Sequence, residues 1–276
     1  MALAIDVPSG PAIGLSEFCE KFRENGFDTA DPQSLAAAAP LLASLARNRI
    51  FLAELVTREL EADLVFQREA NGYSPQVIML HSEANYFVRA NLWPSPSDEI
   101  YRQNRPESFF YHVPHDHNFN FLTVGYLGPG YESDEYDYTN EKVAGYPDEP
   151  IEVVFKGRHR LVQGDVALYR AGQDVHSQLP PETLSVSLNI VDASTRVFFR
   201  EQYVFDHNLQ SLRCVIGLRC NPALFALAAM VGGDEAHGRL WHIHANHDSE
   251  YVAMQALNAL SEAAADRDAA IEVITE

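Results

Sequence analysis

The sequence predicts a mainly β protein whose strand region is flanked by helices at both ends. Hydrophobic residues recur at helical spacing before residue 70, and apolar and polar side chains alternate over much of residues 71–204. Helical spacing returns beyond residue 205. We therefore divide the chain into an N-terminal helical region (1–70), a single small β-barrel (71–204) and a C-terminal helical region (205–276).

The composition is that of a globular protein that does not favour anionic partners. The 276 residues are 46% hydrophobic and 11% aromatic, which is enough for one sizeable core with appended elements. The formal net charge of −19 argues against nucleic acid or an anionic membrane as a partner, because both need a basic surface. A neutral or cationic small molecule suits this charge better.

The cysteines and the first residues indicate the compartment in which the protein is expected. The three cysteines include no closely spaced pair, so we expect no disulfide scaffold and a reducing, cytoplasmic location. Residues 1–14 lack the basic stretch and the long apolar run of a signal peptide, and they read as a flexible lead-in. No apolar run is long enough to predict a transmembrane helix.

The N-terminal region contains three predicted helical runs. They are Ser16–Asn25, Leu35–Arg47 and Ile50–Phe66. Asp31 followed by Pro32 predicts the start of the second run, and Pro40 predicts a break or kink within it. We expect this region to pack on the barrel or on a second subunit.

Short apolar or alternating segments predict the strands of the barrel. They are Val77–Leu80, Tyr86–Leu92, Tyr111–Thr123, Ile151–Phe155, Val166–Tyr169, Thr183–Val191 and Val197–Phe205. In the segment Thr183–Val191, the polar residues Ser185, Ser187 and Asn189 share one face. That face either lines the interior, where Ser187 and Asn189 would suit a ligand, or lies outside in water.

The C-terminal region is predicted to be helical and holds a cluster of histidines. The predicted helices are Leu209–Leu218, Pro222–Val231, Ala236–Ile243 and Ser249–Ala264. The histidines are His237, His242, His244 and His247. On a helix, side chains two residues apart diverge by about 200°, so His242 and His244 would not readily share an ion. We expect surface or interface histidines here.

A histidine-rich stretch in the middle of the chain is the first candidate site. If residues 111–123 are extended, His115 and His117 share one face with Tyr111, Phe119 and Phe121. Two imidazoles placed two residues apart on a strand can point at one metal ion. Phe119 and Phe121 would keep bulk water away from that ion.

A second stretch completes the pattern. A turn at Gly164 and Asp165 precedes the strand Val166–Tyr169, and a turn at Gly172 precedes His176. The order of the two stretches resembles the two-motif signature of the cupin superfamily, over roughly residues 71–204.

The resemblance implies a cupin-type (jelly-roll) β-barrel in which one divalent metal is bound by His115, His117 and His176. The chain departs from the family pattern where a glutamate ligand is usual, because those positions are Phe121 and Leu122. Further departures are Arg170 in place of a proline, one additional residue between Gly172 and His176, and Pro180 in place of an asparagine. The departures narrow the expected site to three histidines, as in some thiol dioxygenases. Glu132 is a fallback fourth ligand if the turn Leu127–Gly130 returns it to the site.

The resemblance also implies an activity, a mononuclear Fe(II) oxygenase or dioxygenase. It would combine O₂ with a small polar molecule that is cationic or resembles an amino acid, and another divalent metal remains an alternative. Tyr111 or Tyr169 would orient the substrate or supply a proton. Arg89 would hold a substrate carboxylate if its strand face lines the barrel mouth, and it would lie exposed if that strand is an edge. The 2-oxoglutarate route is not expected, because it needs a carboxylate where His117 stands.

Three further hypotheses stay open. The same metal can act as a Lewis acid in an isomerase or lyase, or the barrel can be a non-catalytic ligand-binding or sensor module. The acidic and tyrosine residues of Tyr131–Tyr138 form either an outer hairpin or a lip that recruits a cationic substrate. Cupin-like barrels with helical flanks often pair, so the resemblance also implies a homodimer.

Overall fold

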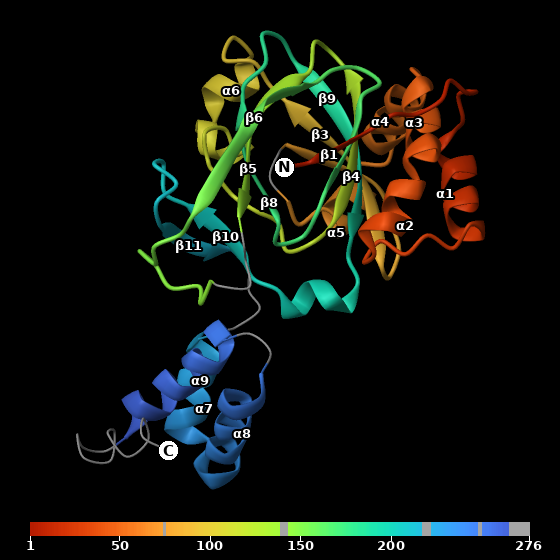
Figure 1. Cartoon of the computed structure of the whole chain (residues 1–276). Helices are drawn as coiled ribbons and strands as arrows, with labels where there is room; N and C mark the ends of the chain where they lie inside the picture. The colour runs from red at the N-terminus through yellow and green to blue at the C-terminus, as the bar shows by residue number, and fades with distance from the viewer. Residues whose placement is uncertain (74–75, 139–142, 217–221, 248–249, 265–276) are drawn as a thin grey trace.

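The computed structural model describes residues 1–73, 76–138, 143–216, 222–247 and 250–264, and strands form its central part (Figure 1). One sheet has six strands in the order β1-β7-β4-β9-β3-β2, a second has three in the order β6-β5-β8, and β10 pairs with β11. The predicted class, mainly β with helical flanks, is confirmed. Among the described residues, hydrogen bonds do not join the two larger sheets into one closed barrel.

The strands of the larger sheets are antiparallel neighbours. The six-stranded sheet contains β1 (Leu3–Ile5), β2 (Val77–Ser82), β3 (Tyr86–Trp93), β4 (Phe121–Leu127), β7 (Val166–Tyr169) and β9 (Ser185–Asp192). The three-stranded sheet contains β5 (Tyr131–Tyr138), β6 (Val153–Leu161) and β8 (Asp174–Leu179). The ribbon of β10 (Gln202–Phe205) and β11 (Leu212–Ile216) lies beside the lower end of the barrel.

The six-stranded sheet has two faces of different character. Pairing places Arg89 and Thr123 directly opposite Asn189 on the two flanking strands, so these polar side chains share the face toward the second sheet. The alternate residues Leu122 and Leu188 are fully buried on the opposite face, in the core shared with the N-terminal helices. The alternation predicted for Thr183–Val191 therefore resolves with its polar residues facing inward.

The N-terminal helices cover the apolar face. They are α1 (Leu15–Glu24), α2 (Pro32–Ala37), α3 (Ala39–Arg47), α4 (Phe51–Glu61) and α5 (Val65–Ala70). Asp31 caps α2 by accepting a hydrogen bond from the Gln33 amide at 3.1 Å. Pro40 lies in the first turn of α3, so it starts a helix instead of bending one. The predicted run Ile50–Phe66 is divided because Asp63 and Leu64 adopt left-handed conformations (φ 53° and 58°).

Two predictions about the ends of the barrel are wrong. Residues 3–5, expected to be flexible, form β1 and pair with β7 at the sheet edge. The predicted helix Leu209–Leu218 is instead β11 over its residues 212–216, because Leu212 is buried beside Phe205 of the partner strand. The range 71–204 predicted for the barrel thus omits β1 and β11, both of which pair with its strands.

Other segments differ in their limits. The strand predicted for Tyr111–Thr123 begins only at Phe121, and the residues before it make isolated bridges. The strand predicted for Val197–Phe205 is a 3₁₀ turn at Thr195–Phe199 followed by β10. A short helix α6 (Glu99–Gln103) and a 3₁₀ turn at Pro106–Phe109 fill the predicted loop before the histidines.

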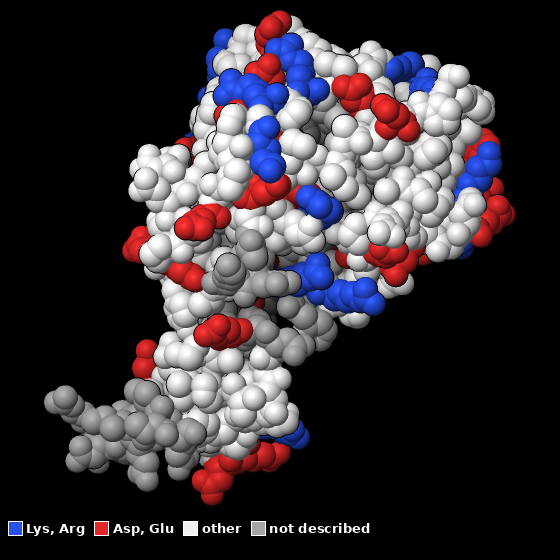
Figure 2. Space-filling view, in the orientation of Figure 1, with Lys and Arg blue, Asp and Glu red and all other residues white. Residues whose placement is uncertain are grey.

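The C-terminal helices form a separate group below the barrel (Figure 1). They are α7 (Pro222–Val231), α8 (Gly233–Asn246) and α9 (Glu250–Ala263), and they pack around Leu240, Ala256 and Leu260. In the described parts of the chain, no single helix is long and apolar enough to cross a membrane. The segments Pro32–Arg47 and Phe51–Glu61 meet that test only as a pair bent by 71°. On the face shown in Figure 2, basic and acidic side chains are interspersed.

Candidate metal centre

Backbone hydrogen bonds bring the two histidine motifs together. The amide of His115 donates to the carbonyl of His176 at 3.0 Å, and the amide of His176 donates back at 2.9 Å. The carbonyl of His117 accepts from the amide of Gly172 at 2.8 Å, in the turn after β7. These bonds fix the segment before β4 against β8 and the turn that precedes it. The imidazoles therefore converge because the main chains that carry them are paired.

Asp116, between the two histidines, points away from them and holds the segment in place. It is fully buried, and its carboxylate accepts from the amide of Tyr203 at 2.6 Å and from the hydroxyl of Tyr138. Its own amide donates to the carbonyl of Tyr203 at 3.1 Å. This anchoring to β5 and β10 fixes which way the flanking imidazoles face.

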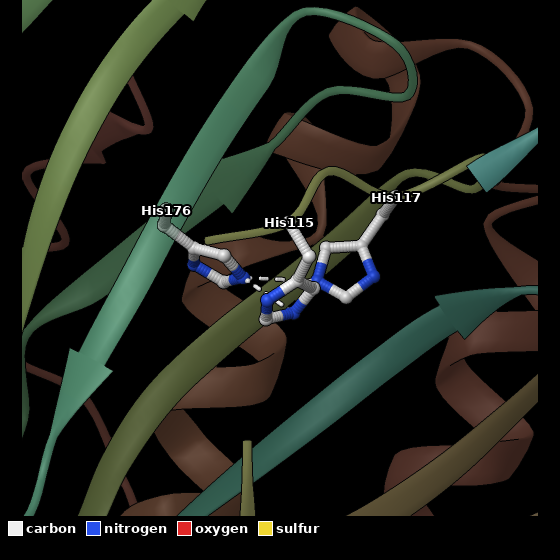
Figure 3. A group of neighbouring side chains, drawn as sticks. All are labelled: His115, His117 and His176. Atoms are coloured by element: carbon white, nitrogen blue, oxygen red, sulfur yellow. Dashed lines mark hydrogen bonds between the residues drawn. The ribbon is translucent and has the colours of Figure 1, made fainter. Parts of the chain in front are cut away.

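The three imidazoles meet at their Nε2 atoms (Figure 3). His176 Nε2 lies 3.0 Å from His117 Nε2 and 3.2 Å from His115 Nε2. Nitrogen ligands about 2.0–2.1 Å from one ion are separated by roughly 2.9–3.4 Å when their bonds diverge by 90–110°. The observed separations fit one shared metal ion, and the group His115, His117 and His176 is a candidate site for it.

Hydrogen bonding alone does not account for this convergence. Besides the two imidazoles, the amide nitrogen of Gln178 lies 2.9 Å from His176 Nε2. One imidazole nitrogen carries either a single proton or a single lone pair, so it cannot make three good hydrogen bonds at once. On the far side of His115, Nδ1 lies 2.8 Å from the carbonyl of Val113. That contact places the proton on Nδ1 and leaves the Nε2 lone pair for a metal.

Burial keeps the imidazoles in the neutral form that binds metals. Burial lowers the pKa of His115 to about 4. The pKa values of His117 and His176 are lowered well below the usual value, first by burial and then by the neighbouring imidazoles. Because the group contains no carboxylate, a divalent ion held by it would keep its full charge.

An aromatic wall surrounds the imidazoles inside a cavity of about 240 Å³. The rings of Phe119 and Phe121 lie 4.7 and 4.8 Å from that of His117, and the ring of Phe110 lies 4.9 Å from that of His115. The cavity reaches the inner face of the six-stranded sheet, where Arg89 and Asn189 line it. Apolar rings next to the nitrogens exclude water from the site.

The structure brings together most of the predicted substrate-binding residues. Arg89, Phe119, Phe121 and Asn189 line the cavity with the imidazoles. Ser187 is buried on the same sheet face, but its hydroxyl accepts from Trp93 Nε1 at 3.0 Å and it is not part of the lining. The polar residues of β9 thus face inward as one alternative predicted, but Ser187 binds Trp93 and does not line the cavity.

Glu132 and Tyr111, both predicted site residues, lie away from the cavity. Glu132 lies on the outward side of β5 and accepts from Arg160 at 3.0 Å, so the hairpin returns Tyr131 to the interior instead. Tyr111 is buried elsewhere and donates to the carbonyl of Pro94 at 2.9 Å. The residues on either side of Tyr111 have positive φ angles (57° and 58°), so the extended chain that would align it with the histidines is interrupted.

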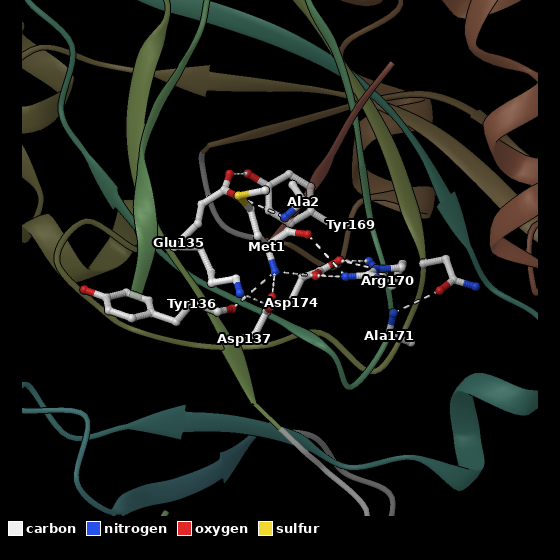
Figure 4. Close-up of polar contacts among 11 residues, drawn as sticks. Met1, Ala2, Glu135, Tyr136, Asp137, Tyr169, Arg170, Ala171 and Asp174 are labelled. Atoms are coloured by element: carbon white, nitrogen blue, oxygen red, sulfur yellow. Dashed lines mark hydrogen bonds and ion pairs between the residues drawn. The ribbon is translucent and has the colours of Figure 1, made fainter. Parts of the chain in front are cut away.

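Tyr169 contacts the site with its ring and not with its hydroxyl. The ring lies 4.6 Å from that of His176 and stacks on Phe121. The hydroxyl donates to Glu135 at 3.2 Å (Figure 4), and both residues line a second cavity of about 440 Å³. Burial raises the pKa of Glu135, whose other oxygen accepts from the amide of Ala2 at 3.0 Å. Tyr169 therefore separates the two cavities.

Several lining residues were not among the site residues predicted from the sequence. Gln178, Tyr131 and Trp93 line the cavity, and Gln202 lies 3.3 Å from His117 Nδ1. Gln178 is two residues after His176 on a strand, so alternation alone places it on the same face. Tyr131 and Trp93 stack at 3.8 Å across the two sheets, a contact with no signal in the local sequence.

The C-terminal histidines do not gather around one point. His237 and His244 contact the carbonyls of Ala229 and Ala253, and His242 contacts Asn246. Among the described residues, the only group of three with metal-binding geometry is the one in the barrel. The helical conformation of α8 explains this, because side chains two residues apart point in different directions.

Comparison with known proteins finds similarity in three-dimensional structure only. No family model and no curated protein matches the chain. Hydroquinone 1,2-dioxygenase from Sphingomonas sp. TTNP3 is similar with a TM-score of 0.30 and 13% identity, over 48% of this chain and 73% of that one. A cupin domain from Bordetella pertussis has a TM-score of 0.24 and 14% identity, over 44% of this chain and 97% of that one. The DMSP lyase DddQ from Ruegeria pomeroyi has a TM-score of 0.28 and 9% identity, over 71% of this chain and 79% of that one.

Similarity at this level does not indicate a reaction. The reaction has to be inferred from the residues of this chain. The most informative of them are the three histidines whose buried imidazoles lie in the aromatic cavity.

Proposed function

We propose that this cupin-fold chain is a metal-dependent oxidoreductase, a mononuclear Fe(II) oxygenase or dioxygenase that combines O₂ with a small polar molecule. The observation that supports it is the convergence of three buried Nε2 atoms. That of His176 lies 3.0 Å from that of His117 and 3.2 Å from that of His115. A ferrous ion held there would supply the redox chemistry of O₂ and would keep coordination positions free of protein ligands.

The residues of the chain have separate roles in this proposal. His115, His117 and His176 hold the ion, and backbone pairing keeps them in position without its help. Phe119 and Phe121 exclude water from the reacting groups. Tyr131 is a buried phenol in the cavity wall, and burial raises its pKa, so it stays protonated and can donate a hydrogen bond.

Metal analysis of variants tests the site. The purified protein is expected to bind one equivalent of Fe(II) under anaerobic conditions, and His115→Ala or His176→Ala is expected to lower the bound metal at least tenfold. His242→Ala is the matched control, because it removes a histidine of α8 and should leave the metal content unchanged. Retention of stoichiometric iron by both barrel variants would contradict the assignment.

Oxygen uptake tests the reaction. Iron-loaded protein is expected to consume O₂ with at least one member of a panel of small acids, amino acids, amines, thiols and phenols, and His176→Ala is expected to abolish that consumption. Conversion of a compound without O₂ uptake would assign a lyase or isomerase in place of an oxygenase. Iron binding with no conversion of any compound would assign a ligand-binding module.

The predicted homodimer and cytoplasmic location remain part of the proposal. Light scattering of the purified protein measures the first, and fractionation of the cells that make it measures the second.

A further inference from the structure

The charge of the cavity is opposite to that of the chain. The sequence has 39 acidic and 20 basic residues, yet no aspartate or glutamate is found among the described residues that line the cavity. Of the lining residues in the described part of the chain, Arg89 alone carries a permanent charge. The net charge of the protein therefore does not describe the site, and the cationic substrate suggested by that net charge would face an arginine.

Arg89 is buried without an anion. Arg89 lies on β3 and is 7% exposed, and its Nε has no hydrogen-bond partner among the residues that the structure describes. No ion pair reaches its guanidinium from the described part of the chain, and burial lowers the pKa of Arg89. An unpaired buried charge is costly, and a guanidinium offers donors in a fork that matches a carboxylate.

Aromatic rings hold the guanidinium in place. Its central carbon lies 5.1 Å from the ring centre of Tyr73 and 5.9 Å from that of Phe87. Such rings stabilise a cation over their faces and cannot accept the in-plane hydrogen bonds of its N–H groups. The rings orient Arg89, and its donors remain for a ligand.

Three amide side chains in the cavity have oxygen atoms without hydrogen-bond partners among the described residues. They belong to Asn91, Gln178 and Asn189, which are only 8%, 3% and 2% exposed. Buried polar atoms are nearly always paired in folded proteins, so several orphans in one cavity indicate a polar ligand. Carbonyl oxygens accept hydrogen bonds, which calls for a donor on that ligand.

We infer that the cavity takes a small organic acid, its carboxylate held by Arg89 and a hydroxyl or amino group held by the amide oxygens. The volume of about 240 Å³ is roughly that of eight water molecules, which limits the ligand to a compact molecule. The inference names the substrate class for the proposed function and rests on it for the reaction. Recognition by Arg89, however, is measurable without the reaction.

Binding of acids and of their neutral amides tests this assignment. Lactate and benzoate, with lactamide and benzamide as uncharged counterparts, are titrated by calorimetry into zinc-loaded protein, where no redox reaction occurs. Each acid is expected to bind at least tenfold more tightly than its amide. Arg89→Gln is expected to remove that preference, and Arg89→Lys to retain part of it, because a lysine keeps the charge and loses the fork.

Arg49→Gln is the matched control. Arg49 also lies over a tyrosine ring, with its central carbon 5.2 Å from the ring centre of Tyr126, but it is outside the cavity. It is expected to keep the full preference for acids. If Arg89→Gln fails to give a folded protein by circular dichroism, Arg89→Lys still decides the matter through a reduced preference.

The outcomes separate this inference from the proposed function. Acids that bind no more tightly than amides, acids that do not bind, or a preference unchanged in Arg89→Gln and Arg89→Lys would each overturn it. The same titrations in metal-free protein measure Arg89 alone. A preference that depends on Arg89 but persists in a protein unable to bind iron would leave the acid subsite standing and remove the oxygenase.

Discussion

At the scale of single residues, the imidazoles of the candidate metal centre are both buried and uncharged. His115 is 2% exposed and His176 also 2%, so a proton on either ring would sit in a poorly solvated place. The same burial that suits a metal also makes the metal-free protein sensitive to acid. Acid lowers the stability because the imidazoles bind protons more readily in the unfolded chain than in the folded one.

We therefore expect the metal-free protein to lose stability as the pH falls below about 6.5. Between the ordinary pKa of 6.5 and the folded value of about 4, the unfolded state binds one more proton at His115. Each such proton lowers the free energy of unfolding by about 1.4 kcal/mol per pH unit. Urea unfolding at pH 7, 6 and 5 in the presence of a chelator measures the slope.

His115→Gln is the comparison for that slope. It removes one titrating ring, so stability should fall less steeply with acid by about that amount per pH unit. Equal slopes in the two proteins would show that His115 is not held neutral by the fold.

The sequence was sufficient to group the three histidines and insufficient to place the residues around them. The spacing of His115 and His117 and the later His176 follows strand alternation and turn order, which are local signals. The sequence leaves two alternatives for Arg89, buried or exposed, because its burial depends on which strands flank β3, a property of the whole sheet. Tyr111 was misplaced because two left-handed residues beside it break the alternation.

At the scale of elements, the hairpin between β4 and β5 requires glycine. Gly130 has a φ of +85°, and a Cβ there would lie 2.1 Å from the carbonyl oxygen of Leu161. The close approach lets β5 enter the second sheet with Tyr131 facing inward toward the cavity. The turn thus contributes directly to the wall of the site.

Alanine at Gly130 should therefore be more damaging than alanine at Gly164. Gly164 also has a positive φ (+91°), but nothing lies within 4 Å of an added Cβ. Gly164→Ala is expected to cost about 1–2 kcal/mol of strain, and Gly130→Ala about 1–3 kcal/mol more through the clash. Chemical denaturation of both variants gives the difference, and equal losses would argue against a required close approach.

The type of an element was predictable where its hydrophobic pattern was long. Prediction failed where pairing with another strand determined the conformation. The helices before residue 62 and the alternating strand β9 follow clear periodicities. β1 has three residues and β11 five, which is too short for a period to be read. Each is a strand because an edge was available to it, and that edge is invisible in the local sequence.

At the scale of the whole molecule, the helical layer and the site use opposite faces of one sheet. Leu42 and Leu45 of α3 are fully buried in a core that includes Leu188 and Ile190 of β9. Asn189, between those two residues, lines the cavity. The N-terminal helices therefore support the site from behind without touching the ligand space.

We expect Leu42→Ala to destabilise the whole barrel by about 2–5 kcal/mol, because it leaves a void in that shared core. Iron content at saturating metal should be unchanged as long as the protein is folded. Leu60→Ala is the control, since Leu60 is 64% exposed and should change the free energy of unfolding by less than about 0.5 kcal/mol. Similar stabilities of the two variants would show that the helices are not a structural part of the barrel.

The anchoring of Asp116 by β10 has a consequence for synthesis. His115 and His117 are held by partners that lie later in the chain, at Gly172, His176 and Tyr203. While the ribosome still covers Tyr203, Asp116 lacks its partner on β10, and the histidine segment can pair only with β8 and the turn before it. The orientation of the histidine segment is therefore completed only after β10 has been synthesised.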